Sequence, residues 1–299
     1  MTAATQVTAE LLADWPLPRP GEDKNSRGRV LIVGGSRLAP GGVMLAAEAA
    51  LRAGAGKAQV VTVDSIADQL AVRMPECLVR GAPETKDGNL APEAVRAIVD
   101  QARSVDVVLL GPGLLDPSTA DDLVLSVLPD LEGAVVLDAM ALGCLASSPD
   151  ALHHLTAVLT PNTDELGVAL GVREEDDYEP DLDVDTVTLA RRTGAVVTCG
   201  SSRTVTADPD ARLWHDDAGG SGLGVSGSGD VLSGLVLGFL ARGAEPAQAA
   251  TWAAHVHAVA GERLARDVGE VGFLARELLP VVPKVLAELA NRGGGGAGA

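Results

Sequence analysis

Short apolar runs alternate along the first two thirds of the chain with stretches of helical periodicity. The runs are rich in β-branched residues and bounded by glycine or polar residues, as expected for buried strands. Parallel strands that are buried on both faces read as continuous apolar runs, and the helices between them supply right-handed crossovers. The alternation therefore predicts an α/β fold, in which a central, mostly parallel sheet carries helices on both faces in three layers (αβα).

The expected elements can be placed by residue range. Strands are predicted at residues 28–34, 58–63, 105–110, 134–137, 157–160 and 195–199. Helices are predicted at residues 41–54, 92–103, 119–128, 165–170 and 183–192. The last third differs, because an antiparallel pair (203–207 and 211–214) precedes three helices at 229–242, 246–266 and 273–291.

No segment has the composition of an interdomain linker. We therefore expect an N-terminal arm at residues 1–27 and a single domain at residues 28–291. The glycine-rich residues 292–299 are predicted to be a disordered tail.

Acidic side chains dominate the charge of the chain. It has 41 Asp and Glu residues against 23 Lys and Arg residues, which gives a formal net charge of −18. General nucleic-acid binding is excluded, because a strongly acidic protein is repelled by the negatively charged phosphate backbone. The apolar runs are too short to span a membrane, and three widely spaced cysteines exclude a disulfide framework. We expect a cytoplasmic protein, in which an anionic ligand needs a local site of N–H groups or a cation.

Four loops are candidate ligand sites, because ligands of parallel sheets bind beyond the carboxyl ends of the strands. Two of them, residues 34–42 and residues 111–113, are rich in glycine, which lets a ligand approach the backbone closely. The same glycines also suit tight turns. Neither loop has the Gly-Lys-Ser/Thr of a phosphate-binding Walker loop or the GxGxxG spacing of a dinucleotide site.

The third loop follows the strand predicted at 157–160. Pro161 ends that strand, and Asn162 and Glu165 have the spacing of a capping box at the start of a helix. The alternative is that Asn162 and Glu165 face phosphates or a hydrated magnesium ion, which prefers oxygen ligands. Both interpretations stay open at this point.

The fourth loop gives the strongest signal. Half of residues 219–230 are glycine, and the run leads directly into an apolar helix. A loop of this kind is entropically costly to order, and it offers consecutive N–H groups at a positive helix end, where phosphate binds well. Asp230 lies in the first turn of that helix. It is either a favourable first-turn acid or a carboxylate that takes a proton from a hydroxyl during phosphoryl transfer, and we favour the second role.

The histidines do not predict a metal site. His255 and His257 are two residues apart on one helix, about 200° around its axis, so they cannot converge on one ion. Cys199 ends a predicted strand and is interpreted as a small buried residue rather than a nucleophile.

Six motifs occur in a characteristic order between about residues 19 and 265. They are GRVLIVGGS (28–36), LRAGAG (51–56), MPE (74–76), GPGL (111–114), VLDA (136–139) and SGSGDVLSG (226–234). The last motif is specific to the ribokinase-like superfamily. The first three together are similar to those of the ADP/ATP-dependent NAD(P)H-hydrate dehydratases within it.

This resemblance implies an enzyme that repairs the hydrated, redox-inactive form of NADH or NADPH. Members of the family use ADP or ATP, with Mg²⁺, to phosphorylate the ring hydroxyl, and then eliminate phosphate to regenerate the nicotinamide. The resemblance places the hydrate along Gly42, Gly113 and Asn162, with Asp230 as the catalytic residue at the hydroxyl. It also implies a homo-oligomer, either a dimer or a tetramer.

The resemblance further implies a nucleotide site. The residues expected there are Cys199, Gly200, Ser201, Ser202, Arg203, Gly227, Ser228 and Gly229. The amides of residues 227–229 would contact its phosphates, and Asn162 and Glu165 would contact magnesium through water. The chain departs from the usual family pattern of Asp, His, Lys and Asn at Met140, Asn162, Cys199 and Gly220. Arg203 is the expected substitute for the missing lysine.

Two alternatives follow from these departures. The Asn162-x-x-Glu165 element is closer to the vitamin kinases of the same superfamily, which favours a kinase of the hydroxymethylpyrimidine or hydroxyethylthiazole type. Met140 and Cys199 instead favour a nucleotide-binding relative without catalytic activity.

Overall fold

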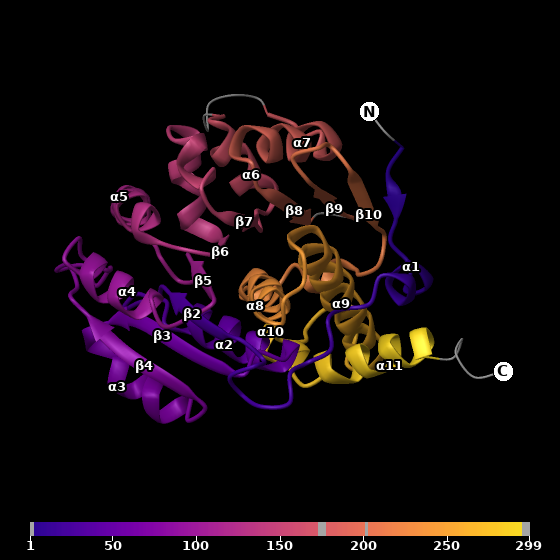
Figure 1. Cartoon of the computed structure of the whole chain (residues 1–299), viewed down its shortest axis with the longest axis horizontal. Coiled ribbons are helices and arrows are strands. Elements are labelled where there is room, and N and C mark those ends of the chain that lie inside the picture. Colours follow the sequence, from indigo (N-terminus) through magenta and orange to yellow (C-terminus); the bar gives the residue numbers. More distant parts are fainter. Residues whose placement is uncertain (1–2, 173–177, 201–202, 295–299) are drawn as a thin grey trace.

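A ten-stranded sheet forms the centre of the molecule, in the order β1-β10-β9-β8-β7-β6-β5-β2-β3-β4 (Figure 1). The computed structural model describes residues 3–172, 178–200 and 203–294. The strands are β1 (Thr5–Gln6), β2 (Arg29–Val33), β3 (Lys57–Val63), β4 (Cys77–Ala82), β5 (Val107–Leu110), β6 (Ala134–Leu137), β7 (Thr156–Leu159), β8 (Val196–Gly200), β9 (Thr204–Ala207) and β10 (Leu213–Asp216). Only β9 pairs antiparallel with its neighbours, so the mostly parallel sheet is confirmed, as is the antiparallel pair near its end.

Helices cover both faces of the sheet. They are α1 (Ala9–Asp14), α2 (Gly41–Ala53), α3 (Asp64–Arg73), α4 (Ala94–Ala102), α5 (Pro117–Val127), α6 (Thr163–Leu170), α7 (Leu182–Thr193), α8 (Ser228–Ala241), α9 (Pro246–Asp267), α10 (Ala275–Leu278) and α11 (Val282–Gly294). Helices α2, α3, α8 and α9 lie on one face and α4 to α7 on the other, which confirms the three layers (Figure 1). None of the described helices is both long and apolar enough to cross a membrane.

The direction of the chain across the sheet reverses between β2 and β5. From β2 the chain proceeds through β3 to β4, whereas from β5 it proceeds the opposite way through β6 and β7 to β8. The loops that follow β2 and β5 therefore meet at the carboxyl edge, where Gly35 N donates a 2.7 Å hydrogen bond to Pro112 O. Such a reversal is the usual place for a ligand site in an open parallel sheet.

Helices α2 and α8 pack with their backbones in close approach. A Cβ atom on Gly234 would lie 2.7 Å from the Cβ of Ala49, and one on Gly238 would lie 2.6 Å from the Cβ of Ala53. Both helices begin at the carboxyl edge of the sheet, so this contact brings the first turn of α2 beside the first turn of α8.

Several elements differ from the sequence prediction. Residues 5–14, expected in an arm, form β1 and α1, and β1 joins the sheet beside β10. Helix α3 and strand β4 were not predicted, because β4 is an edge strand whose exposed positions alternate with half-buried ones. The helix expected at 273–291 is interrupted around Pro280, which lacks an N–H group. Arg292, expected in the tail, lies in α11, and residues 295–299 lie outside the described residues.

The α2–α8 contact predicts that Gly238→Ala lowers the free energy of unfolding by about 1–3 kcal/mol, because the added methyl group overpacks the interface. Urea denaturation of the purified variant measures this change. Gly41→Ala is the control, since no atom lies within 4 Å of the position that its Cβ would take. Equal stability of the Gly238 variant and the wild type would contradict the close approach.

Candidate functional site

A cavity of about 800 Å³ opens at the carboxyl edge of the sheet. It lies beyond β6, β7 and β8, between the first turns of α6 and α8 and the middle of α9. The lining residues are Asp138, Ala139, Thr160, Pro161, Asn162, Glu165, Gly200, Thr204, Ala218, Gly219, Gly220, Ser221, Leu223, Gly224, Val225, Gly227, Ser228, Gly229, Asp230, Leu232, Ala254, His257 and Ala258.

Three carboxylates face one another in this cavity. Asp138 follows β6, Glu165 lies in the first turn of α6, and Asp230 lies in the first turn of α8. Burial, together with the negative charges of Asp138 and Glu165, raises the pKa of Asp230 to about 7. Burial likewise raises the pKa of Glu165 to about 7. Carboxylates with such pKa values can accept and return protons at neutral pH.

Asp138 connects the elements that carry the site. Its Oδ1 accepts a 2.8 Å hydrogen bond from Thr160 Oγ1, and its Oδ2 accepts a 2.9 Å hydrogen bond from Ser233 Oγ. Ser233 Oγ also lies 3.2 Å from the backbone oxygen of Asp230. The ends of β6 and β7 are thereby tied to the first turn of α8, which holds Asp230 in place. Burial raises the pKa of Asp138 as well.

The predicted substrate residues Gly42 and Gly113 lie on the α2 side of Asp230. A Cβ atom on Gly42 would lie 2.8 Å from Asp230 Oδ1 and 2.9 Å from Gly113 N. Gly113 has a φ of +73°, which favours glycine. The structure therefore brings Gly42, Gly113 and Asp230 together, next to the cavity, with bare backbone around the carboxylate.

The first turn of α8 presents main-chain N–H groups to the cavity. Gly227 caps the helix with a φ of +91°, and no side chain bonds the N–H groups there. Nothing lies within 4 Å of the position of a Cβ on Gly229, so the backbone is open to a ligand. Ser228 Oγ lies 2.9 Å from His257 Nε2, and burial lowers the pKa of His257 to about 4, which keeps its imidazole neutral.

The capping box predicted at the start of α6 is present. Asn162 Oδ1 accepts a 2.9 Å hydrogen bond from Glu165 N, and Glu165 Oε2 accepts one of 2.9 Å from Asn162 N. Both residues also line the cavity, so capping does not remove them from the site. Within the described residues, no group of three or more His, Cys, Asp or Glu side chains could hold a metal ion.

Two predicted nucleotide residues do not reach the cavity. Cys199 is fully buried in β8, where burial raises the pKa of its thiol to about 12. The Arg203 guanidinium donates a 2.8 Å hydrogen bond to Asp183, and Arg203 is not among the residues that line the cavity. Gly200 does line the cavity, whereas Ser201 and Ser202 lie outside the described residues. No Lys or Arg lines the cavity in the described part of the chain.

Sequence reasoning missed the contribution of α9. His257 lines the cavity and contacts Ser228, and His255 contacts Asp216 instead, so the two histidines do point apart. An isolated histidine on an apolar helix gives no signal of this kind. Thr160 and Asp138 lay in noted motifs, but their hydrogen bonds depend on neighbouring strands that are distant in sequence.

The comparisons with known proteins agree over nearly the whole chain. Residues 30–284 match the family model described as NAD(P)H-hydrate dehydratase. The ADP-dependent (S)-NAD(P)H-hydrate dehydratase of Xanthomonas campestris pv. campestris is 43% identical over 283 residues, which are 95% of this chain and 96% of that protein. A bifunctional NAD(P)H-hydrate repair enzyme of Moorella thermoacetica is 37% identical over 89% of this chain, which spans only 50% of that protein.

Solved structures share the fold. A ribokinase-like superfamily protein of Enterococcus faecalis superposes with a TM-score of 0.81 at 23% identity, covering 97% of this chain and 98% of that one. The ADP/ATP-dependent NAD(P)H-hydrate dehydratase of Bacillus subtilis, co-crystallised with ATP and Mg²⁺, superposes with a TM-score of 0.80 at 24% identity, covering 97% and 100%. The predicted ribokinase-like fold is confirmed.

The buried carboxylate predicts that Asp230→Asn stabilises the protein at high pH. Because the folded-state pKa of Asp230 is about 7 and that of an unfolded aspartate is about 4, the folded protein binds more protons between these pH values. Its free energy of unfolding therefore falls as the pH rises from about 4 to 7. We expect the variant to gain about 4 kcal/mol at about pH 8, and less than half of that at about pH 5.

Chemical denaturation across this pH range measures the gain. Asp210→Asn, at an exposed turn, is the control for removing one charge from an acidic protein. A gain that is independent of pH, or equal to that of the control, would contradict the assigned environment of Asp230.

Proposed function

Because this chain belongs to the NAD(P)H-hydrate dehydratase family, we propose that it repairs nicotinamide nucleotides. It is a carbon–oxygen lyase that dehydrates (S)-NAD(P)H hydrate to NAD(P)H in a nucleotide-dependent reaction, with release of phosphate and of AMP or ADP. The observation that carries this proposal is the position of Asp230, which lies beside the amides of Gly227 and Gly229 in the first turn of α8 and against Gly42 and Gly113. The vitamin-kinase alternative is not favoured, because the relatives matched over most of the chain are named as dehydratases or repair enzymes.

The nucleotide donor, ADP or ATP, binds with its phosphates at the first turn of α8. The N–H groups there and the helix dipole favour negative charge, and the open space at Gly229 admits a phosphate. Gly200 and Ser228 complete the adjoining surface.

Magnesium fits this site only together with the nucleotide. The three carboxylates and the lack of Lys and Arg among the described lining residues would repel a bare polyphosphate. Glu165 and Asn162 present oxygen atoms that can hold a hydrated Mg²⁺, an ion that typically keeps several waters and binds phosphates as well. When bound, Mg²⁺ neutralises charge on the phosphates.

Asp230 acts as the general base. Its carboxylate accepts the proton of the ring hydroxyl, and that oxygen forms a bond to the terminal phosphorus of the nucleotide while AMP or ADP leaves. Elimination then breaks the carbon–oxygen bond, phosphate leaves with the electron pair, and loss of a ring proton restores the double bond. Asp138 keeps the start of α8 in position during these steps, because it accepts the hydrogen bond of Ser233.

The hydrate lies along Gly42 and Gly113, on the α2 side of Asp230, and extends to Asn162, which lines the cavity. A Cβ atom on Gly42 would lie 2.8 Å from Asp230 Oδ1, so glycine at this position lets the carboxylate lie against the first turn of α2. We place the enzyme in the cytoplasm as a dimer or tetramer.

Purified protein should restore the near-ultraviolet absorbance of reduced nicotinamide from hydrated NADH when ADP or ATP is added with Mg²⁺. Asp230→Asn should lower kcat by about 10²–10⁴-fold, because the proton acceptor is lost, while nucleotide binding persists. Asp210→Asn is the matched control for charge. Folded protein that binds nucleotide without restoring absorbance, or that accumulates a stable phosphorylated alcohol, would contradict the proposed function.

The pH dependence of kcat/KM reports the ionisation of the base. Since Asp230 must be deprotonated to act and its pKa is raised to about 7, kcat/KM should rise with pH up to about 7 and then level off. Initial rates between about pH 5 and 9 measure the profile. A profile that is flat, or that falls as the pH rises through 7, would contradict the role of Asp230.

A further inference from the structure

One wall of the cavity consists of a loop with almost no regular structure. This cavity wall, residues 218–225, follows β10 and contains four glycines. Most of its residues line the cavity beside the first turn of α8. Ordering such a glycine-rich backbone is costly, so other parts of the molecule must hold it if nucleotide is to bind a preformed surface.

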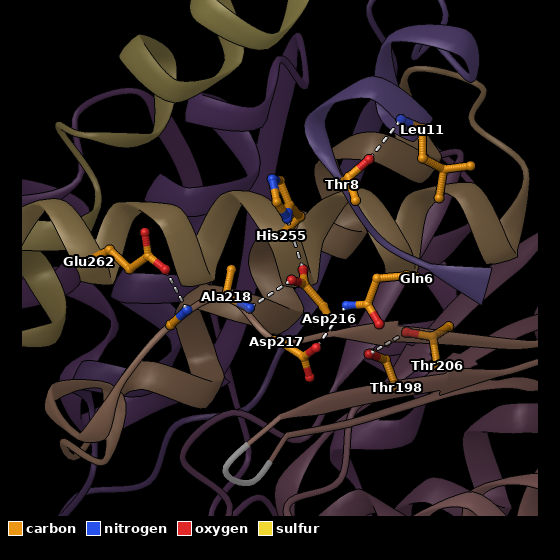
Figure 2. Close-up of polar contacts among 11 residues, drawn as sticks. Gln6, Thr8, Leu11, Thr198, Thr206, Asp216, Asp217, Ala218, His255 and Glu262 are labelled. Carbon is orange, nitrogen blue, oxygen red and sulfur yellow. Dashed lines mark hydrogen bonds and ion pairs between the residues drawn. The ribbon is translucent and has the colours of Figure 1, made fainter. Parts of the chain in front are cut away.

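Glu262 on α9 supplies one anchor for the cavity wall. Its Oε1 accepts a 3.1 Å hydrogen bond from the backbone N–H of Gly219 (Figure 2). Gly219 has a φ of +108° and itself lines the cavity. A hydrogen bond to a charged acceptor is stronger than one between neutral groups, so this contact fixes the start of the wall.

His255 on the same helix supplies a second anchor. His255 Nδ1 lies 3.0 Å from Asp216 Oδ2, and both side chains are buried. Asp216 Oδ1 in turn accepts a 3.0 Å hydrogen bond from Ala218 N, as Figure 2 shows. Helix α9 thus holds two successive amides of the cavity wall, one directly and one through Asp216.

Packing on α9 agrees with these anchors. A Cβ atom on Gly261 would lie 2.6 Å from Leu223 Cδ2, so Leu223 occupies the space that this glycine leaves. Neither His255 nor Glu262 lines the cavity, whereas His257 on the same helix does. The two anchor residues therefore act through the wall and not by touching the ligand.

We propose that His255 and Glu262 are positioning residues for the nucleotide, because they hold the cavity wall in its binding conformation before nucleotide arrives. The proposal rests on the proposed function for the identity of the ligand. It predicts that loss of an anchor weakens nucleotide binding without comparable effects on the hydrate, which lies across Asp230 on the α2 side.

The test compares Glu262→Ala with Glu262→Gln and His255→Ala with His255→Asn. The glutamine still offers an Oε1 acceptor to Gly219 N, and the asparagine still offers a side-chain N–H near the position of Nδ1. Gln6→Ala is the control, since Gln6 donates an exposed 3.0 Å hydrogen bond to Asp217 in the same stretch of chain. The readouts are the Kd of ADP with Mg²⁺ by calorimetry, both KM values, kcat and the Tm of each variant.

We expect each alanine variant to raise the Kd and KM of ADP about tenfold, as for one lost charge-assisted hydrogen bond, with the KM of the hydrate and kcat within about twofold. The conservative variants and Gln6→Ala should stay within about twofold of the wild type. Wild-type affinity in both alanine variants, or ADP and hydrate KM values that rise together, would overturn the proposal. So would a Glu262→Gln variant as weak as Glu262→Ala.

The two proposals fail in different ways. Calorimetry measures ADP binding without turnover, so a wild-type protein that binds ADP but does not restore reduced nicotinamide would contradict the proposed function alone. The comparison of the Kd values would still decide the role of α9.

Discussion

The site depends on the close packing of α2 against α8. Because Gly234 and Gly238 let the two helix backbones approach, the first turns of both helices meet at the carboxyl edge of the sheet. There the buried Asp138 receives hydrogen bonds from Thr160 and Ser233 and so ties two strands to the first turn of α8. The burial of Asp230, and with it the raised pKa of a carboxylate that can act as a base at neutral pH, follows from this arrangement.

The carboxylates that line the cavity would repel the polyphosphate that we propose it binds. The protein carries a net charge of −18, and the described lining residues include three carboxylates but no Lys or Arg. The proposed answer is local, because N–H groups at a helix N-terminus can bind phosphate without a cationic side chain. We propose that a cation bound to the nucleotide balances the remaining charge, and that Glu165 and Asn162 hold this cation. In the proposed site, helix α9 would hold the wall that faces the nucleotide.

The sequence predicted those parts of the fold and site that depend on local patterns. The buried run of β2, the Ala-rich α2 and the glycine run that leads into α8 all have periodicity or composition that identifies them, and Asp230 follows from its place in that first turn. The α6 capping box was likewise readable from the spacing of Asn162 and Glu165.

The rest depends on contacts between residues that are distant in sequence. Arg203 pairs with Asp183, 20 residues away, and the edge strand β4 lacks a continuous apolar run. The contacts of His255, His257 and Glu262 form only when α9 packs against β10 and α8. No pattern within the helix itself distinguishes these side chains from others on α9.

The most direct test of the central claim is a crystal structure of the enzyme with a non-hydrolysable nucleotide, Mg²⁺ and a stable alcohol analogue of the hydrate. We expect phosphate oxygens on the amides of the first turn of α8 and an Asp230 carboxylate oxygen about 2.6–3.2 Å from the alcohol oxygen. Phosphates bound elsewhere, or an Asp230 side chain turned away from the alcohol, would contradict it.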